Sequence, residues 1–301
     1  MSETEPGTRV GFIGLGNMGR PMAQQLSAAG YEVRGFDVDP AARATLEAQG
    51  IATADSVNGV VADAEVVILM LPSSAIVRQV LDQIVRDAGT PDSPMIVDMG
   101  SSDPLVTQTL GAELRERGYA LIDAPVSGGV SGAQAGTLTI MVGGATGDVE
   151  RVRSVLTTMG RPTHVGPVGS GHAVKALNNL LSATHLWISS EAVLAGERFG
   201  IDPQMFLDVV NSSSGRSGST EQKWPRFVLP DTFDSGFSLA LMVKDMKIAT
   251  DLCQQLGIGT SLGEEAVKRW SEASTGLPEN ADHTEIVRWL RTSASHKQPA
   301  T

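Results

Sequence analysis

Short apolar runs alternate with helix-forming segments through the first half of the chain. Runs of this length that are rich in branched residues predict buried strands, and segments such as residues 18–29 and 73–85 predict the helices between them. The predicted strands span residues 9–13, 31–36, 66–71, 95–99, 120–123 and 137–142. Strands and helices that alternate in this way predict an α/β fold with a parallel, doubly wound sheet, which binds ligands at the carboxyl ends of its strands.

The pattern changes after His164. Residues 169–200 begin with Gly-Ser-Gly, contain no proline and end on a glycine that can take the left-handed cap conformation, so they predict one long helix. Further helices are predicted at residues 203–210, 238–256, 262–273 and 282–291, with no strand among them. We therefore predict an N-terminal dinucleotide-binding Rossmann domain, residues 1–168, joined by the long interdomain helix to an all-helical C-terminal domain for substrate binding and oligomerisation, residues 169–301.

Most of the circumference of the long helix is apolar. Leu177, Leu181 and Ile188 recur at helical spacing, and Leu186 and Val193 fill other faces, which predicts that the helix is buried. One small helical domain cannot easily cover so much apolar surface. A homodimer or homotetramer with the helical domains packed together is therefore expected.

A short polar stripe interrupts the apolar surface near the start of this helix. His172, Lys175, Asn179 and Ser182 follow one another at steps of three or four residues, which brings them to one side. No acidic residue lies at pairing distance from Lys175 on the helix, and the positive end of the helix dipole disfavours a charged ammonium, so the pKa of Lys175 is expected to be lowered. Such a lysine is a candidate general acid or base. The alternative is that the stripe simply faces water.

The first predicted strand leads into a glycine-rich turn. Gly14, Gly16 and Gly19 form the pattern G-x-G-x-x-G between a strand and a helix, where the backbone can approach a pyrophosphate and the helix N-terminus points at its charge. Asp37 ends the second strand, where a carboxylate can accept hydrogen bonds from ribose hydroxyls, and no adjacent arginine could receive a 2′-phosphate. NAD is therefore predicted in preference to NADP. The alternative for Asp37 is an ordinary strand-end residue in a turn.

A second glycine-rich loop, APVSGGVSGAQAG, follows the predicted strand at residues 120–123. Ser127, Gly128 and Gly129 place bare backbone N–H groups beside a hydroxyl, an arrangement that suits a small anion such as a carboxylate. A flexible turn is the alternative for this loop.

Composition narrows the function classes. The chain has 301 residues and a net charge of −11, which argues against a nucleic-acid or anionic-membrane partner. Cys253 is the single cysteine, so no internal disulfide or cysteine-based metal site is possible, which fits a reducing cytoplasm. The chain starts with polar residues rather than a signal peptide, and no apolar run reaches the about 20 residues that span a bilayer. His172 and His185 lack further ligands at metal spacing, so no metal is predicted.

Several segments occur in a fixed order along residues 9–290, namely GFIGLGNMGRPMA, MLPSS, VDMGSSDP, DAPVSGG, GSGHAVKALNN and FSLALMVKDM. Together they resemble the β-hydroxyacid dehydrogenases, the family of 3-hydroxyisobutyrate dehydrogenase, tartronate semialdehyde reductase and, more distantly, 6-phosphogluconate dehydrogenase. The resemblance implies that Lys175 is the catalytic acid or base and that Asn179 helps to hold the reacting oxygen. It also implies that Ser127, Gly128 and Gly129 bind the substrate carboxylate.

The same resemblance implies a set of cofactor-binding residues. These are Gly14, Leu15, Gly16, Asn17, Met18, Gly19, Asp37, Leu71, Pro72, Ser101 and Lys244, the last of which is expected to lie near the substrate as well. Two positions depart from the family pattern. Gly100 stands where many members have serine, a change expected to be neutral, and Gly218 stands where related enzymes often carry a bulkier residue, which leaves the exact substrate open.

These features predict NAD-dependent oxidation of a small 3-hydroxy acid to its semialdehyde, with 3-hydroxyisobutyrate as the best single candidate. A more polar substrate, such as glycerate, threonate or a hydroxy-sulfonate, is an alternative, because residues 211–223 are rich in hydroxyl groups. An imine reductase is a second alternative, although the resemblance implies that such enzymes usually replace the catalytic lysine. A non-catalytic dinucleotide sensor is a third, which would need the glycine-rich turn but not Lys175.

Overall fold

The computed structural model describes residues 7–87 and 93–295, and within it the chain divides into two compact units between Lys175 and Ala176. Helix α8, Ser170–Phe199, runs across this division. The sequence-based domain boundary, between residues 168 and 169, falls just before this helix begins. The two units are described separately below.

The first unit is built on one sheet of nine strands. The strands are β1 (Arg9–Ile13), β2 (Glu32–Phe36), β3 (Ala52–Thr53), β4 (Val66–Leu69), β5 (Met95–Asp98), β6 (Leu121–Asp123), β7 (Val126–Ser127), β8 (Leu138–Gly143) and β9 (Gly160–Gly166). Their order in the sheet is β3-β2-β1-β4-β5-β6-β8-β7, with β9 paired to β8. The run from β3 to β6 is parallel and has the strand order of a Rossmann fold, in which the order reverses between β1 and β4.

The far side of the sheet departs from the all-parallel prediction. Strand β8 pairs antiparallel with both β6 and β7, and β9 returns parallel to β8. Only Ala124 and Pro125 separate β6 from β7, and the two strands pair in succession with the same neighbour, β8. Strand β9 was not predicted from the sequence, because it lies at an edge, is half exposed along its length and contains Pro162. The sheet is therefore mixed.

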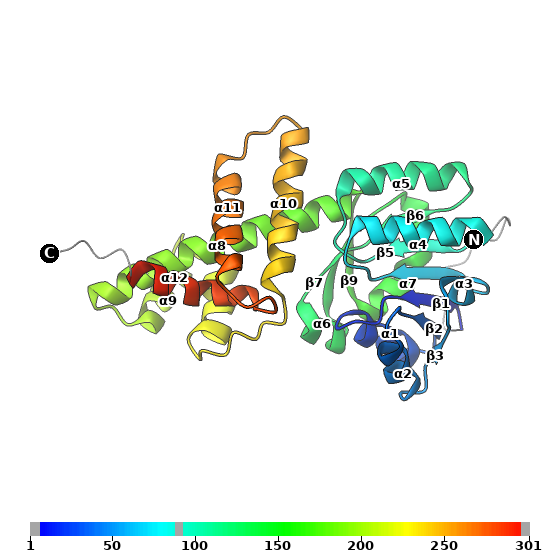
Figure 1. Cartoon of the computed structure of the whole chain (residues 1–301), viewed down its shortest axis with the longest axis horizontal. Coiled ribbons are helices and arrows are strands. Elements are labelled where there is room, and N and C mark those ends of the chain that lie inside the picture. Colours follow the sequence, from blue (N-terminus) through cyan, green and yellow to red (C-terminus); the bar gives the residue numbers. More distant parts are fainter. Residues whose placement is uncertain (1–6, 88–92, 296–301) are drawn as a thin grey trace. The chain divides into compact units, whose positions relative to one another are not determined.

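Helices cover both faces of this sheet (Figure 1). They are α1 (Gly19–Ala28), α2 (Pro40–Glu47), α3 (Val57–Val61), α4 (Ser74–Asp87), α5 (Pro104–Glu116), α6 (Gly129–Ala135) and α7 (Thr146–Met159). Asp39, Ser56 and Asp103 cap the starts of α2, α3 and α5 with their side chains, as short polar residues at helix starts commonly do. Two apolar clusters, one on each face, bury the central strands.

The second unit, residues 176–295, is built of helices joined by loops, as predicted. After α8 it contains α9 (Pro203–Asn211), the π-helix η1 (Ser219–Val228), α10 (Leu239–Gln255), α11 (Ser261–Thr275), the 3₁₀ turn η2 (His283–Glu285) and α12 (Ile286–Ser295). Its core includes Trp187, whose ring centroid lies 6.3 Å from that of Trp270 and 5.7 Å from that of Trp289. The π-helix was not predicted, because its wide turn has no simple sequence period.

One face of α8 remains uncovered in the single chain. Leu181 and Ile188 are 59% and 56% exposed, and Leu177 on the same face is also exposed. The burial predicted for this face is therefore not provided by the chain alone.

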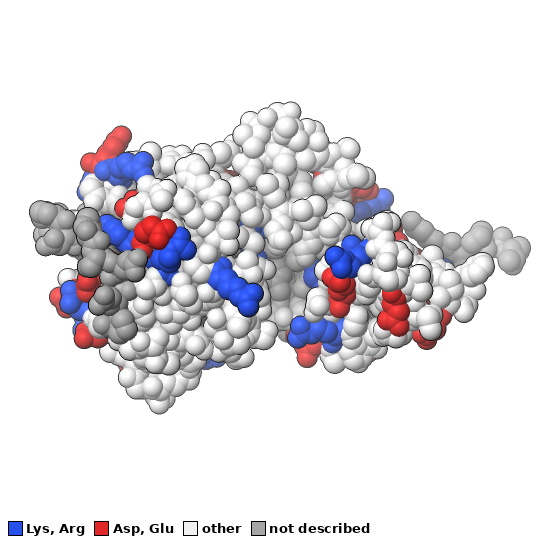
Figure 2. Space-filling model, turned by 180° about the vertical axis from the view of Figure 1, so that it is seen from behind, with Lys and Arg blue, Asp and Glu red and all other residues white. Residues whose placement is uncertain are grey.

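None of the helices in the described ranges is long and apolar enough to cross a membrane. On the face drawn in Figure 2, positive and negative side chains lie in small mixed groups rather than in a field of one sign.

Candidate active site

The glycine-rich turn after β1 is shaped by close backbone contacts. A Cβ atom added to Gly14 would lie 2.3 Å from the Met70 carbonyl oxygen, and one added to Gly19 would lie 1.8 Å from the Gly14 carbonyl oxygen. Neither contact is sterically possible, so the turn itself requires both glycines. A Cβ atom on Gly16 would meet no protein atom within 4 Å. The missing side chain at Gly16 thus leaves open space in front of the turn, which fits the close approach of a pyrophosphate.

The other residues of this turn divide between the core and the surface. Leu15 is buried, so its backbone rather than its side chain faces a ligand, whereas Asn17 is exposed and Met18 is half buried. Helix α1 begins directly afterwards, and its first N–H groups have no acceptor within the helix. Helix starts of this kind attract the negative charge of a phosphate. The local geometry therefore fits a dinucleotide.

Asp37 is held firmly at the end of β2. Its Oδ2 accepts a hydrogen bond of 2.7 Å from the backbone N–H of Leu15, and its Oδ1 accepts one of 2.9 Å from the N–H of Asp39. An ionised carboxylate has about four acceptor positions, so these two bonds fix its orientation and leave capacity for ribose hydroxyls. The side chain is half buried. Its placement fits the predicted role in binding the adenosine ribose.

An arginine also lies at this position, although the sequence showed none directly next to Asp37. Arg43, from helix α2, donates from Nη1 to the Asp37 carbonyl oxygen at 2.7 Å, and its guanidinium carbon lies 5.9 Å from the centre of the Phe36 ring. The signal was available in the sequence, because Arg43 lies in the early part of a helix that Pro40 starts. A guanidinium in this place can contact an adenine ring or a 2′-phosphate.

The loops after β4 and β5 lie against one another. These loops carry Leu71, Pro72 and Ser101, and the strands before them are neighbours in the sheet. A Cβ atom on Gly100 would lie 2.5 Å from the Leu71 carbonyl oxygen, so a side chain here would force one loop to move. Serine at this position is therefore not neutral in this chain, contrary to the expectation from the sequence. Three predicted cofactor segments thus follow the adjacent strands β1, β4 and β5 at one edge of the sheet.

Ser127, Gly128 and Gly129 form the turn from β7 into α6. Gly128 has φ 135° and Gly129 has φ 63°, values that strongly favour glycine. The backbone conformation of this turn therefore favours glycine at both positions. Its side chains and backbone are partly exposed, which leaves them accessible to a ligand. Binding of a carboxylate here remains a prediction.

The start of α8 is fixed to the sheet by a buried carboxylate. The Asp123 side chain, at the end of β6, accepts hydrogen bonds from the backbone N–H groups of Gly169, at 2.7 Å, and His172, at 2.8 Å. A Cβ atom on Gly171 would lie 2.3 Å from the Met141 carbonyl oxygen, so the Gly-Ser-Gly segment is needed for this close approach. The carboxylate satisfies helix N–H groups that otherwise lack acceptors.

His172 lies buried beneath this helix start. Its Nδ1 is 2.9 Å from the Thr107 hydroxyl oxygen, and its Nε2 is 3.7 Å from Oδ2 of Asp98. Asp98 in turn accepts hydrogen bonds from Gly100 N–H at 3.0 Å and from the Ser102 hydroxyl at 2.8 Å. His172 therefore connects the start of α8 with the loop after β5, which is a structural position, whereas His185 is exposed.

Lys175 and Asn179 are both buried, at 8% and 5% exposure, so the alternative that they face water is excluded. In the second unit the Asn179 amide donates from Nδ2 to Oδ2 of Asp245 at 2.7 Å, and the other oxygen of Asp245 lies 3.4 Å from Nζ of Lys244. Asp245 orients the predicted catalytic amide and links it to Lys244. The sequence interpretation missed Asp245, although it directly follows Lys244 in the segment FSLALMVKDM.

A buried histidine of the second unit lies near a further cation. Burial lowers the pKa of His283 from 6.5 to about 3, and the positive charge of Lys223 acts in the same direction. The charge of Asp282 and a hydrogen bond to the Phe237 backbone act against this lowering. His283 is therefore neutral at ordinary pH.

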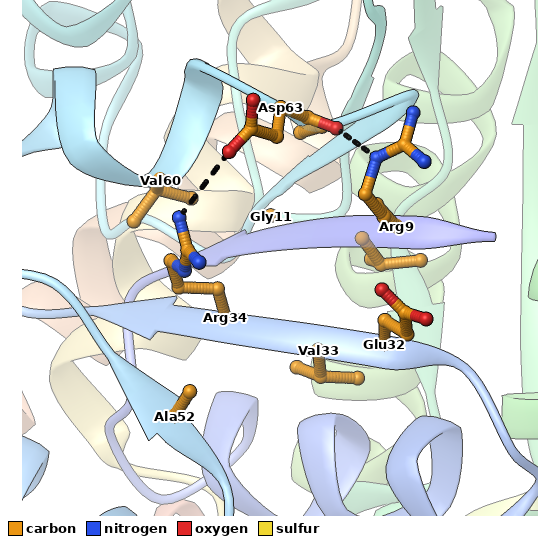
Figure 3. Close-up of a pocket in the computed structure, with 10 residues that line it drawn as sticks. Arg9, Gly11, Glu32, Val33, Arg34, Ala52, Val60 and Asp63 are labelled. Atoms are coloured by element: carbon orange, nitrogen blue, oxygen red, sulfur yellow. Dashed lines mark hydrogen bonds and ion pairs between the residues drawn. The ribbon is translucent and has the colours of Figure 1, made fainter. Parts of the chain in front are cut away.

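One hollow of about 550 Å³ lies elsewhere on the first unit, between the starts of β1 and β2 and helix α3. Figure 3 shows that Arg9 and Arg34 both point at Asp63. Nε of Arg9 donates to the Asp63 carbonyl oxygen at 2.5 Å, and Nη1 of Arg34 lies 3.8 Å from its carboxylate. This hollow is at the opposite strand ends from the glycine-rich turn, so it is separate from the cofactor loops. Over the ranges that the structure describes, no group of His, Cys, Asp and Glu side chains is arranged to hold a metal ion.

Two family models match the chain in succession. The NAD binding domain of 6-phosphogluconate dehydrogenase matches residues 9–178, and the domain described as NAD-binding of NADP-dependent 3-hydroxyisobutyrate dehydrogenase matches residues 169–290. Together they span nearly the whole chain. The two descriptions agree on a nicotinamide dinucleotide and leave open whether it is NAD or NADP.

Individual relatives are similar over most of their length. The 2-(hydroxymethyl)glutarate dehydrogenase of Eubacterium barkeri is 38% identical over 82% of this chain and 83% of its own. A probable 3-hydroxyisobutyrate dehydrogenase of Mycobacterium tuberculosis is 34% identical over 95% of this chain and 99% of its own. A solved structure of M. tuberculosis 3-hydroxyisobutyrate dehydrogenase with L-serine has a TM-score of 0.88 at 33% identity, covering 95% of this chain and 99% of that one.

Proposed function

The chain belongs to the β-hydroxyacid dehydrogenase family, and from this membership we propose that it oxidises a small 3-hydroxy acid to its semialdehyde with NAD. 3-Hydroxyisobutyrate is the first candidate substrate. The observation that carries the proposal is the buried Lys175, one helical turn before an asparagine whose amide is oriented by Asp245. A lysine and an amide in this arrangement are suited to one reacting oxygen.

The chemistry follows from where charge and protons move. A bound nicotinamide would supply the acceptor for the hydride that leaves the carbon bearing the hydroxyl group. Lys175, in its neutral form, accepts the hydroxyl proton, and Asn179 donates a hydrogen bond to the same oxygen as negative charge develops on it. In the opposite direction the protonated lysine returns the proton.

Substrate acids are selected by the turn at Ser127, Gly128 and Gly129. Their N–H and hydroxyl groups donate to the carboxylate, and a charged acceptor makes stronger hydrogen bonds than a neutral alcohol does. NAD is preferred because the fixed carboxylate of Asp37 accepts bonds from the ribose and repels a 2′-phosphate. Lys244, held beside Asp245, lies near the nicotinamide and substrate in this proposal.

The test is a substrate panel. Purified protein is mixed with NAD and with 3-hydroxyisobutyrate, glycerate, threonate, a hydroxy-sulfonate or L-serine, and NADH formation is followed by absorbance. Turnover of 3-hydroxyisobutyrate with the highest kcat/KM supports the first candidate, and preference for a polyhydroxy acid supports the more polar alternative instead. An unbranched alcohol that matches the best acid contradicts the carboxylate pocket. If the protein binds NAD but turns over no acid or imine, the result supports the alternative of a non-catalytic dinucleotide sensor.

We also infer that the protein forms at least a dimer through its helical unit. The exposed apolar face of α8, with Leu177, Leu181 and Ile188, would be covered by a second copy. Light scattering at micromolar concentration should give the mass of two or four chains. Replacing both Leu181 and Ile188 with Glu should reduce that mass, and a monomeric mass for the unaltered protein contradicts the inference.

A further inference from the structure

A buried histidine of the first unit lies between two buried carboxylates. Asp98 and Asp123 end the neighbouring parallel strands β5 and β6, where they are register partners. Nε2 of His172 is 3.7 Å from Oδ2 of Asp98, and its Nδ1 is 3.9 Å from Oδ2 of Asp123. Buried polar groups are costly unless they interact with one another, so the ring and the two carboxylates stabilise a single arrangement.

The directions of the hydrogen bonds show how the His172 ring is held. The Thr107 hydroxyl donates to the Asp103 carbonyl oxygen at 2.9 Å, which uses its only hydrogen. The Thr107 oxygen is 2.9 Å from Nδ1 of His172, so Nδ1 carries a hydrogen and donates to it. Nε2 has no hydrogen-bond partner among the residues that the structure describes, and it faces Asp98. One nitrogen is thus bound to α5, and the other is presented to the end of β5.

The contact with Asp98 reaches the loop after β5. Oδ1 of Asp98 accepts from the Gly100 backbone N–H at 3.0 Å, and Oδ2 accepts from the Ser102 hydroxyl at 2.8 Å. These two residues flank Ser101, a predicted cofactor residue. The carboxylate that faces His172 is therefore the same one that fixes this cofactor loop.

The contact with Thr107 reaches the loop after β4. Thr107 lies in the first turn of α5, whose N-cap residue, Asp103, donates its backbone N–H to the Ser74 hydroxyl at 2.8 Å. Ser74 is the first residue of α4 and lies two positions after Pro72, another predicted cofactor residue. Both nitrogens of the His172 ring are thus connected to loops that are expected to hold the dinucleotide.

The backbone of His172 belongs to the helix that carries the predicted catalytic lysine. Its N–H donates to Asp123 at 2.8 Å, and Lys175 follows one turn later on α8 within the same compact unit. A single residue therefore joins the first turn of α8 to two cofactor loops.

We propose that His172 is a positioning residue for the reaction. Its ring holds the first turn of α8, and with it Lys175, in a fixed place relative to the loops after β4 and β5. This inference rests on the proposed function, in which Lys175 accepts the hydroxyl proton. The ring is buried, so it acts through its neighbours. A displacement of about 1 Å between reacting groups can lower a rate about 100-fold, which gives such a residue a large effect on turnover.

Three variants test the positioning role. His172→Leu keeps a large side chain but removes both ring nitrogens, so kcat for the best acid should fall about 10- to 100-fold. KM and the Kd for NAD should stay within about threefold, since the groups that bind both ligands are unaltered. His172→Gln, whose amide can still donate a hydrogen bond, should recover most of kcat. Leu114→Ala, at a buried position two turns further along α5, should lower thermal stability and leave kcat unchanged.

Single-turnover kinetics locate the affected step. The rate of NADH formation in one turnover should fall by the same factor as kcat in His172→Leu, because the reacting groups are misplaced. A normal kcat in this variant, or an unchanged single-turnover rate, would overturn the positioning role. If His172→Leu does not fold, Thr107→Val removes the acceptor of Nδ1 and should lower kcat in the same direction. An unchanged kcat in Thr107→Val would then contradict the proposal.

Hydrogen exchange followed by mass spectrometry tests the connection without any substrate. His172→Leu should increase exchange in residues 99–103 and 169–175, whereas His172→Gln should not, and residues 9–19 should exchange normally in both. If this pattern occurs but no acid is turned over by the unaltered protein, the proposed function fails and the connection stands. If the unaltered protein oxidises an acid while exchange and kcat are unchanged in His172→Leu, the positioning role fails and the proposed function stands.

Discussion

The glycine-rich turn after β1 and the polar stripe of α8 are suited to their proposed ligands in opposite ways. In the turn, Gly14 and Gly19 are required by contacts with the backbone of Met70 and of Gly14 itself, and Gly16 leaves open space. On the stripe, Asn179 and Ser182 have hydrogen-bond partners from distant parts of the chain. The first region is shaped by missing side chains, and the second is defined by the identity of the side chains that are present.

This difference indicates which substitutions affect which step. Adding atoms to the turn should impair its fold or the binding of any dinucleotide, whatever the substrate. Changing a functional group on the stripe should alter turnover or substrate choice and leave the cofactor in place. The following experiments test that division.

The largest effect is expected for Lys175→Met. This change keeps a long side chain at a buried position but removes the group that exchanges a proton with the substrate, so kcat should fall about 10²- to 10⁴-fold. NAD affinity, measured by calorimetry, should change little because the cofactor loops are not altered. Activity at a tenth of normal or above would assign the proton transfer to another group.

Two glycines of one turn should respond differently to alanine. Gly19→Ala forces a backbone shift and should lower the free energy of unfolding by about 1–3 kcal/mol or more. Gly16→Ala meets no protein atom, so its unfolding should be normal while its affinity for NAD falls. Thermal unfolding and NAD titration of both variants measure the two effects. Equal NAD affinity in Gly16→Ala and the unaltered protein would contradict a pyrophosphate at this turn.

His283 should make the protein less stable in acid. The pKa of His283 is about 3 in the folded protein and 6.5 in the unfolded chain. Between these two pH values the unfolded chain binds a proton at His283 and the folded protein does not. The contribution to stability is complete above pH 6.5 and is lost as pH falls toward 3, at about 1.4 kcal/mol per pH unit. Denaturant unfolding at pH 7.5 and pH 5 should therefore differ by about 2 kcal/mol from this group.

A pair of histidine variants isolates that contribution. His283→Gln should flatten the dependence of unfolding free energy on pH between 7.5 and 5, although its stability at pH 7.5 is lower. His185→Gln, at an exposed position of α8, should keep the slope of the unaltered protein. An unchanged slope in His283→Gln would show that other groups cause the acid sensitivity.

The smallest effect is expected at the edge of the cofactor site. Asp37→Ser removes the carboxylate that repels a 2′-phosphate, so the ratio of kcat/KM with NAD to that with NADP should fall about tenfold. Arg43→Ala in the same background should reverse the gain with NADP, because its guanidinium lies at the Asp37 backbone. Equal or better efficiency of the unaltered protein with NADP would contradict the predicted preference.

Local patterns in the sequence were sufficient to predict the α/β half, the helical half, the glycine-rich turn and helix α8. Each of these depends on neighbouring residues, such as the spacing of Gly14, Gly16 and Gly19 or the proline-free run to Gly200. The mixed part of the sheet and the π-helix η1 could not be predicted in the same way. An edge strand such as β9 is half exposed and carries a weak pattern, and a π-helical turn has no distinct period.

The sequence by itself determined the family, the fold class and the residues of the polar stripe, because their chemistry and spacing lie within single motifs. Three hydrogen bonds were decided only by the tertiary structure. Asn179 donates to Asp245, Lys223 donates to Ser182, and Arg43 donates to the Asp37 backbone. The physical reason is that a hydrogen bond depends on distance in space. Residues far apart along the chain come within reach of one another only when packed helices and strands bring them together.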